Sequence, residues 1–402
     1  MASTLNILIL VLTVGSIEIL VRTFSVQTLG GETIRGVPLA PRKWSEVVAL
    51  HKPVIEQMAH KQPFLIYDPN LGWTVAPSRQ NATGLDASSV EGLRAPRVGM
   101  SFVDRRTRHS GLPEKAATVR VALLGDSMTY SYEVRCEESW GHALEGQLGP
   151  AVQVLNFGIS GYGLNQVFLR YEKDTQPWNP QIVLIGITSE EIQKIMSVYN
   201  FLMHPDWVGM PFVRPRLVLK DDTSIPINQP IPTPAEVFAH RTIRELSHLD
   251  QDACFHRLEW EREGVWGLFE KSYFFRFLFS LRPPSDSPQK WASQESMMVL
   301  GQRIIRTMVQ DVRNQGAIPL VVHFPYQFEL RLAAEYGDKY TPLSVQMLRD
   351  DGIDHYDTTA CLIKAKAFDE YMPHAHYSPT ANAVIAKCLE PIVRKEISQL
   401  TQ

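Results

Sequence analysis

Side chains that could carry nucleophilic chemistry follow short apolar runs of the sequence. Gly125, Asp126 and Ser127 come directly after the apolar residues 119–124. If that run is a strand, Ser127 lies at the edge of a sheet beside a helix start, where backbone amides and the helix dipole favour a developing oxyanion. Ser127 is therefore a candidate nucleophile, although a serine in such a turn more commonly caps a helix.

A glycine-rich segment follows the next apolar run, residues 152–156. It contains Gly158, Gly161 and Gly163, and glycine lets a backbone amide approach a ligand closely. The same pattern also fits an ordinary turn. It does not fit a dinucleotide-binding fingerprint, because its glycines are in the wrong order and follow the second strand.

A histidine near the C-terminus is a candidate base. His376 precedes Ser378 and Pro379, which predict a helix with Ser378 as its N-cap. A base at this place could reach a serine across the sheet edge, whereas the simplest alternative is a histidine in a surface turn. His374 and His376 could also be a metal-binding pair, but the sequence offers no convincing third ligand. We therefore expect neither a metal nor an organic cofactor.

Alternating strand-like and helix-like segments must position these residues. Apolar runs of strand length occupy residues 119–124, 152–156, 182–187, 318–324 and 353–357. Helical spacing of apolar residues is found at 138–148, from Asn165, at 297–312 and after Ser378. Continuous apolar runs are typical of parallel strands covered on both faces. The sequence thus predicts an α/β fold, a doubly wound three-layer α/β/α sandwich with a mainly parallel sheet.

Residues 200–290 interrupt this alternation and contain many prolines and aromatic residues. We expect them to form an insertion, such as a cap over the site. Within it, the phenylalanine-rich residues 273–281 could be core, a lipid-facing patch or an acyl pocket. Core is the interpretation that we favour.

The N-terminus is almost free of charge. Residues 4–21 contain no charged side chain except Glu18, and as a helix they would be about 27 Å long, enough to cross a hydrocarbon core. We interpret residues 1–24 as an uncleaved membrane anchor; the alternative is a buried or interfacial helix. A cleaved signal peptide fits poorly, because a basic start and a clear cleavage site are lacking. The basic residues that follow favour a cytoplasmic body under the positive-inside rule.

Composition bounds the remaining possibilities. The 402 residues carry 40 Lys and Arg against 43 Asp and Glu, a net charge of −3, which argues against a nucleic-acid partner. The four cysteines lie far apart, which excludes a zinc ribbon and a disulfide-dense scaffold. We expect three parts: the anchor, a connecting segment at 25–117, and an α/β domain at 118–402 that contains the insertion.

The three segments, in this order, resemble the SGNH/GDSL hydrolase superfamily of esterases and acyl-group hydrolases. The resemblance spans residues 119–392 without the insertion, and residues 67–73 and 156–166 are similar to membrane-anchored bacterial members. It implies that Ser127 is the nucleophile, that His376 is the base, and that the amides of Ser127 and Gly161 form part of the oxyanion hole. The resemblance also implies that the domain after the anchor lies outside the cytoplasm, whereas the basic residues after the anchor favour the opposite orientation.

Two positions depart from the family pattern. Ser189 and Glu190 stand where the family usually has Asn and Asp after the third strand, so the resemblance leaves Ser189 as a shorter oxyanion donor. The acid that usually precedes the histidine is also absent, because His374 and Pro373 stand there. The possible acids are Asp357 and Asp369, and a Ser–His dyad is the alternative.

The resemblance implies a serine esterase or acyl-ester hydrolase that acts on acylated carbohydrate or lipid. An O-acyltransferase would use the same residues, so the sequence does not separate hydrolysis from transfer. Because of the two departures, a non-catalytic binding module of the same fold in an envelope assembly is the rival hypothesis.

Overall fold

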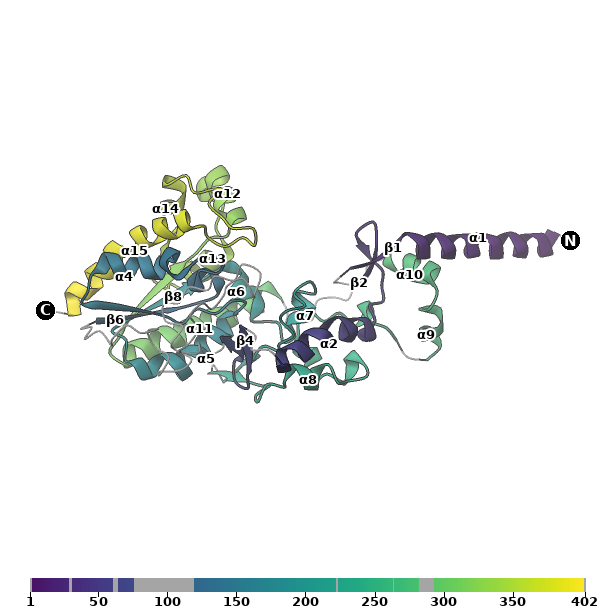
Figure 1. Ribbon diagram of the computed structural model, residues 1–402, viewed down its shortest axis with the longest axis horizontal. Helices are drawn as coiled ribbons and strands as arrows, with labels where there is room; N and C mark the ends of the chain where they lie inside the picture. The colour runs from purple at the N-terminus through teal and green to yellow at the C-terminus, as the bar shows by residue number, and fades with distance from the viewer. Residues whose placement is uncertain are drawn as a thin grey trace. The chain divides into compact units, whose positions relative to one another are not determined.

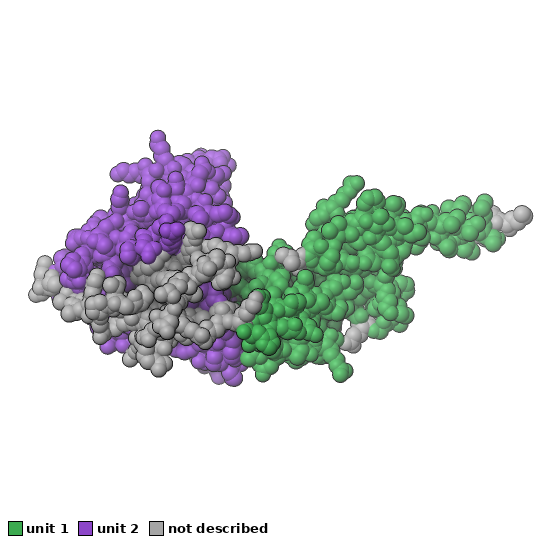
Figure 2. Space-filling view, in the orientation of Figure 1, with its two compact units in different colours: residues 1–62, 197–214, 232–293 green, residues 63–196, 215–231, 294–402 purple. Residues whose placement is uncertain are grey.

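The computed structural model describes residues 2–28, 31–60, 64–75, 119–221, 223–262, 264–281 and 293–400. The chain forms two compact units, coloured separately in Figure 2. Unit 1 comprises residues 1–62, 197–214 and 232–293, and unit 2 comprises residues 63–196, 215–231 and 294–402. This division differs from the expected boundaries at 24 and 117, because most of the insertion joins the N-terminal segment. Residues 76–118 of the expected connecting segment lie outside the described residues.

Unit 2 is built on a five-stranded sheet in which all neighbouring strands are parallel. The strand order is β12-β11-β8-β6-β7. The bounds are β6 Val119–Leu124, β7 Val152–Asn156, β8 Ile182–Ile187, β11 Ile318–His323 and β12 His355–Asp357. The three strands expected at 119–124, 152–156 and 182–187 are confirmed. The strands expected at 318–324 and 353–357 are present as β11 and β12, and both are slightly shorter than expected.

Helices cover both faces of this sheet (Figure 1). Helix α4 (Trp140–Leu148) packs with α15 (Pro379–Leu400) on one face, and α5 (Leu164–Arg170) packs with α11 (Gln294–Asn314) on the other. Each presents an apolar stripe to the sheet, as Ile304, Ile305 and Met308 of α11 do, all of which are buried. The expected three-layer α/β/α sandwich with a parallel sheet is therefore confirmed.

The start of α15 follows the expected helix signal. Ser378 Oγ accepts a hydrogen bond from the amide of Ala381 at 3.2 Å, and Pro379 is the first helical residue. The remaining elements of unit 2 are short. They are β4 (Leu65–Asp68), β5 (Gly72–Val75), α3 (Ser127–Tyr130), α6 (Ser189–Lys194), β9 (Leu217–Lys220), β10 (Thr223–Pro226), α12 (Gln327–Tyr336), α13 (Leu343–Asp350) and α14 (Thr359–Lys364).

The strand order fixes where a ligand site can form. From β6 the chain moves outward to β7, then crosses back to β8 on the other side of β6. In open α/β sheets, ligands bind outside the carboxyl ends of the strands at such a reversal. The carboxyl end of β6 leads into Ser127, and that of β8 leads into Thr188 and Ser189.

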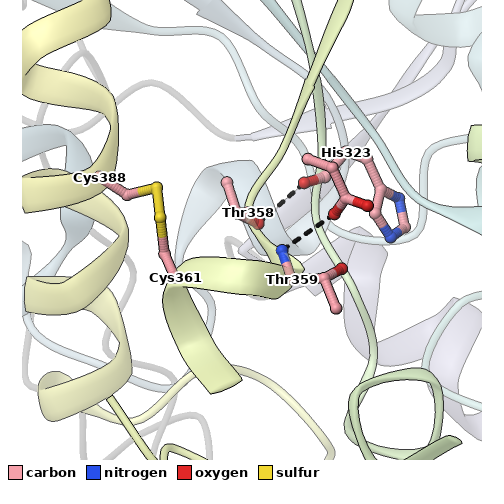
Figure 3. The surroundings of a disulfide bond; sticks show 6 residues. His323, Thr358, Thr359, Cys361 and Cys388 are labelled. Carbon is pink, nitrogen blue, oxygen red and sulfur yellow. Dashed lines mark hydrogen bonds between the residues drawn. A yellow bond between two sulfur atoms is a disulfide. The ribbon is translucent and has the colours of Figure 1, made fainter. Parts of the chain in front are cut away.

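A disulfide joins two helices of unit 2. Cys361 in α14 and Cys388 in α15 form the bond with their Cα atoms 6.2 Å apart (Figure 3). Beside it, the Thr358 hydroxyl donates to the carbonyl of His323 at 2.8 Å, which ties the start of α14 to the end of β11. Cysteine spacing alone did not predict this pairing.

Unit 1 contains the N-terminal helix α1 (Ala2–Phe24) and an antiparallel sheet of β1 (Ser25–Thr28), β2 (Gly31–Ile34) and β3 (Val37–Pro38). The predicted hydrophobic helix is thus confirmed, and its residues Thr4–Phe24 are long and apolar enough to cross a membrane. The other helices are α2 (Trp44–His60), α7 (Asn200–Met203), α8 (Pro234–Val237), α9 (Val265–Phe269) and α10 (Tyr273–Ser280).

The core of unit 1 is aromatic. Trp44 of α2 stacks on Phe238 with ring centroids 5.6 Å apart and lies 5.5 Å from the ring of Phe201. Our interpretation of residues 273–281 as core is wrong. In α10 only Arg276 is buried, and Leu278 and Leu281 are largely exposed. The aromatic residues of this helix are half-buried rather than enclosed in the core.

Candidate active site

Ser127 is the first residue of α3, at the carboxyl end of β6. Asp126 caps this short helix, because its Oδ1 accepts a hydrogen bond from the amide of Met128 at 2.8 Å. Gly125 is required for the tight approach, since a Cβ there would lie 2.2 Å from Thr129 Oγ1. In the part of the chain that the structure describes, no hydrogen bond engages the Ser127 hydroxyl.

The chain folds back directly after α3. Ser131 ends the helix in a left-handed conformation at φ 58°, and the amide of Tyr132 donates to the carbonyl of Ser127 at 3.0 Å. This reversal carries Glu133 to His376, whose Nδ1 lies 2.7 Å from Glu133 Oε2. The ring of Tyr132 packs 5.0 Å from the imidazole. The structure thus brings His376 to the turn that begins at Ser127.

The carboxylate of Glu133 is well partnered. Its Oε1 also accepts a hydrogen bond from the amide of His374 at 3.3 Å. Burial acts to raise the pKa of Glu133, but the hydrogen bond and the charge of His376 outweigh it and hold the pKa below its ordinary value. Glu133 is therefore ionised at neutral pH and can accept a hydrogen bond from Nδ1–H of the imidazole.

The two expected acids lie elsewhere. Asp357 Oδ1 accepts from the amide of Thr359 at 2.9 Å, and Asp369 forms an exposed ion pair with Arg331 at 2.7 Å. Glu133 is not among the residues that the sequence singled out. No spacing rule points to it, because it lies shortly after Ser127 and not in the positions immediately before His376.

Ser189 does not take the expected place in an oxyanion hole. It is the first residue of α6, and its hydroxyl donates to the carboxylate of Glu329 in α12 at 2.5 Å. The same oxygen accepts from the amide of Ser344 at 3.3 Å. Because the hydroxyl has a single proton and Glu329 takes it, Ser189 has no donor left for a substrate oxygen.

The glycine-rich loop between β7 and α5 is held from two sides. Asn156 accepts from the amide of Gly158 at 2.9 Å and donates to the carbonyl of Thr129 at 2.8 Å, which ties the loop to α3. Trp73 of β5 donates from Nε1 to the carbonyl of Ser160 at 3.0 Å. Gly161 follows directly after Ser160 with φ 82°, a conformation that favours glycine.

Asp126 links three strand ends. Its Oδ2 accepts from the hydroxyl of Thr188, after β8, at 3.1 Å, and from the hydroxyl of Tyr326, after β11, at 3.4 Å. Burial raises the pKa of this carboxyl. Asp126 therefore fixes the turn of Ser127 against its neighbours at the sheet edge.

No family model matches the sequence, and no curated protein matches it. The solved structures that resemble the chain include GDSL lipolytic proteins, esterases and lipases. A G-D-S-L family lipolytic protein from Desulfitobacterium hafniense is 13% identical, with 67% of this chain and 95% of that chain covered and a TM-score of 0.32.

Two further solved structures are alike to a similar degree. A lipase/acylhydrolase from Enterococcus faecalis is 10% identical over 68% of this chain and 96% of that chain, with a TM-score of 0.33. An acetyl xylan esterase from Geobacillus stearothermophilus is 12% identical over 67% and 92%, with a TM-score of 0.35. Likeness at this level does not assign an activity or a catalytic residue to this chain.

Proposed function

We propose that the chain is a serine-dependent acyl-ester hydrolase or acyltransferase of the SGNH/GDSL type. The observation that carries the proposal is the 2.7 Å contact between Glu133 and His376, made in the turn that starts at Ser127. A carboxylate that holds one ring nitrogen of a histidine beside a serine at a strand end is the arrangement that serine acyl transfer needs.

In this proposal Glu133 accepts a hydrogen bond from Nδ1–H of His376, so Nε2 is the free base. His376 Nε2 takes the proton of Ser127 while Oγ attacks the ester carbonyl carbon. The resulting imidazolium is stabilised by Glu133, and the amides of Ser127 and Gly161 donate to the oxyanion. Collapse returns the proton to the leaving alcohol and leaves an acyl group on Ser127. Water or a second hydroxyl then takes the acyl group by the same steps in reverse.

The substrates that we propose are acylated carbohydrates or lipids, through the family resemblance and the membrane-type N-terminal helix. Hydrolysis and transfer share every residue above. Product analysis with a simple acetyl ester, with and without added oligosaccharide, separates them: free acetate indicates hydrolysis, and acetylated oligosaccharide indicates transfer.

Labelling with a serine-reactive fluorophosphonate tests the proposal. We expect the wild type to label and Ser127→Ala to lose the label. Ser131→Ala is the matched control, because its buried hydroxyl in the same turn has no hydrogen-bond partner among the described residues, and it should still label. A wild type that never labels, or a Ser127→Ala variant that labels equally, would favour the non-catalytic binding module instead.

We also infer that α1 anchors the protein in a membrane with an extracytoplasmic body. The Cys361–Cys388 disulfide supports this orientation, because disulfides persist in oxidising compartments. Carbonate extraction of membranes tests the anchor, since an anchored protein stays in the pellet. In cells, a thiol reagent should modify these two cysteines only after reduction; modification without reduction would favour a cytoplasmic body.

A further inference from the structure

Two short helices of unit 1 expose an apolar surface. It consists of α9 and the end of α10, and its members are between 47% and 68% exposed. We call these residues the apolar patch: Val265, Trp266, Leu268, Phe269, Leu278 and Leu281. Contiguous apolar surface of this kind marks a contact with a membrane or another molecule.

The apolar patch adjoins the end of the candidate membrane helix. Glu18 of α1 accepts hydrogen bonds from the hydroxyl of Ser272 at 2.9 Å and from the amide of Phe274 at 2.7 Å. One turn later, the guanidinium of Arg22 lies 4.6 Å from the centre of the Tyr273 ring. The C-terminal part of α1 and the start of α10 are therefore fastened together, as Figure 1 shows.

The base of α10 is fixed to the small sheet of the same unit. Tyr273 and Arg276 both donate to the carboxylate of Glu32 in β2, and Arg276 also donates to the carbonyl of Leu39 at 3.1 Å. These polar groups hold one side of α10, while Leu278 and Leu281 at its end are left exposed. The exposure of the apolar patch is thus built into unit 1.

The chemistry of the patch fits a lipid interface. Tryptophan is favoured at the headgroup level, where its ring can be partly apolar and partly wet. Phenylalanine and leucine are typical of the apolar face of helices that lie in a membrane surface. The guanidinium of Arg262, which is paired with Glu270 at 2.8 Å, lies 4.9 Å from the centre of the Trp266 ring and 5.1 Å from that of Phe279. Exposed Lys271 lies between α9 and α10. Apolar residues bordered by basic ones are typical of helices that lie in the plane of a membrane surface.

We propose that the apolar patch is a membrane-interface foot, which inserts into the lipid surface beside the point where α1 emerges. Ile19 and Leu20 of α1, next to the Glu18 junction, are exposed apolar residues as well. This inference depends on the proposed membrane anchor. It adds to the spanning helix a second contact, at the lipid surface, that fixes how unit 1 approaches the bilayer.

Tryptophan quenching in vesicles tests the foot. The full chain is reconstituted into phosphatidylcholine–phosphatidylglycerol vesicles whose acyl chains carry bromine near the headgroups. We expect the bromines to quench part of the wild-type tryptophan emission and to quench Trp266→Phe less. Trp207→Phe is the matched control, because Trp207 is also exposed in unit 1 but stacks on His204 outside the patch. It should leave the quenchable component unchanged.

Flotation of the same samples separates the two proposals. If the full chain does not float with the vesicles, the anchor is wrong and the foot falls with it. If it floats but Trp266→Phe is quenched as strongly as the wild type, the foot alone is overturned. Neither result bears on fluorophosphonate labelling of Ser127.

Discussion

Nδ1 of His376 lies 2.7 Å from Oε2 of Glu133, and the two residues are far apart in the chain. The carboxylate belongs to the same turn as Ser127, because the amide of Tyr132 bonds back to the Ser127 carbonyl. The orienting acid and the nucleophile therefore share one short segment, and the base alone comes from the C-terminal part of unit 2. Any movement of that segment shifts both groups together.

Removing the charge of Glu133 should impair catalysis. In Glu133→Gln the side chain can donate to Nδ1, which favours the tautomer that leaves Nε2 protonated and unable to act as a base. We expect kcat for a simple acetyl ester to fall about 10²- to 10⁴-fold, with little change in KM. Asp369→Asn, which breaks only the exposed pair with Arg331, is the control and should keep wild-type kcat. A loss in the control with none in Glu133→Gln would point back to Asp369.

The Glu133–His376 pair should also make stability depend on pH. The pKa of Glu133 is held below its ordinary value of 4.5, so the folded state binds fewer protons to this group than the unfolded state does. Its stabilisation is full above the ordinary pKa and is lost as pH falls through the lowered value. Urea unfolding at several acidic pH values tests this: the stability advantage of the wild type over Glu133→Gln should shrink as pH falls below about 4.5. A constant difference down to acid pH would contradict it.

Ser189 is expected to matter for stability rather than for the oxyanion. Ser189→Ala removes the 2.5 Å hydrogen bond to the buried carboxyl of Glu329, whose pKa is already raised by burial. Leaving that group without its partner should lower the free energy of unfolding by about 1–3 kcal/mol. The fall in kcat should stay well below the 10²- to 10³-fold typical of a lost oxyanion donor. A fall of that size with unchanged stability would restore Ser189 as a donor.

The strands and the place of Ser127 at the end of one of them could be predicted from the sequence because both depend on local signals. Continuous apolar runs mark buried parallel strands, and the ends of β6, β7 and β8 fall where those runs end. Parallel pairing then places their carboxyl ends at one edge. Ser378 and Pro379 gave the start of α15 for the same reason, since a cap acts over a single turn.

The residues that the sequence did not reveal depend on long-range contacts. Glu133 meets His376 only because Ser131 takes a left-handed conformation and reverses the chain, and serine does not signal that conformation. The Ser189 hydroxyl donates to Glu329, a residue of α12 that is far from Ser189 in the chain. In 273–281, phenylalanine content indicated burial, but burial also depends on what packs against a helix, and α10 is left with one face open.

The Cys361–Cys388 disulfide should stabilise unit 2. It joins residues separated by 27 positions, and the loop-closure model gives a stabilisation of roughly 3.5 kcal/mol for a loop of that length. The double variant Cys361→Ser, Cys388→Ser should therefore unfold at lower urea concentration than the wild type. Reduction should shift the wild type toward the variant and leave the variant unchanged. Cys254→Ser is the control, because Cys254 is a free thiol in unit 1. If reductant does not change the urea concentration at which the wild type unfolds, the bond is absent.

Trp73 should affect catalysis without touching the reacting groups. Its Nε1 donates to the carbonyl of Ser160, and its own carbonyl accepts from the hydroxyl of Tyr162 at 2.6 Å, so it holds the loop of Gly161 from both sides. Trp73→Phe keeps a buried ring but removes the Nε1 donor, a loss of about 0.5–1.5 kcal/mol. If the Gly161 amide serves the oxyanion, we expect kcat to fall up to about 10-fold while KM stays near its wild-type value.

Tyr67→Phe provides the comparison for Trp73→Phe. It removes a hydrogen bond from the same hairpin to the carbonyl of Ile231, away from the glycine-rich loop. A variant that only loosens the hairpin should lower the unfolding midpoint in both cases and lower kcat in neither. A fall in kcat confined to Trp73→Phe therefore assigns the effect to the position of the loop, because the two variants weaken the same hairpin but only one of them releases Ser160. Equal kcat values in the two variants would show that the Trp73 contact does not position the oxyanion donor.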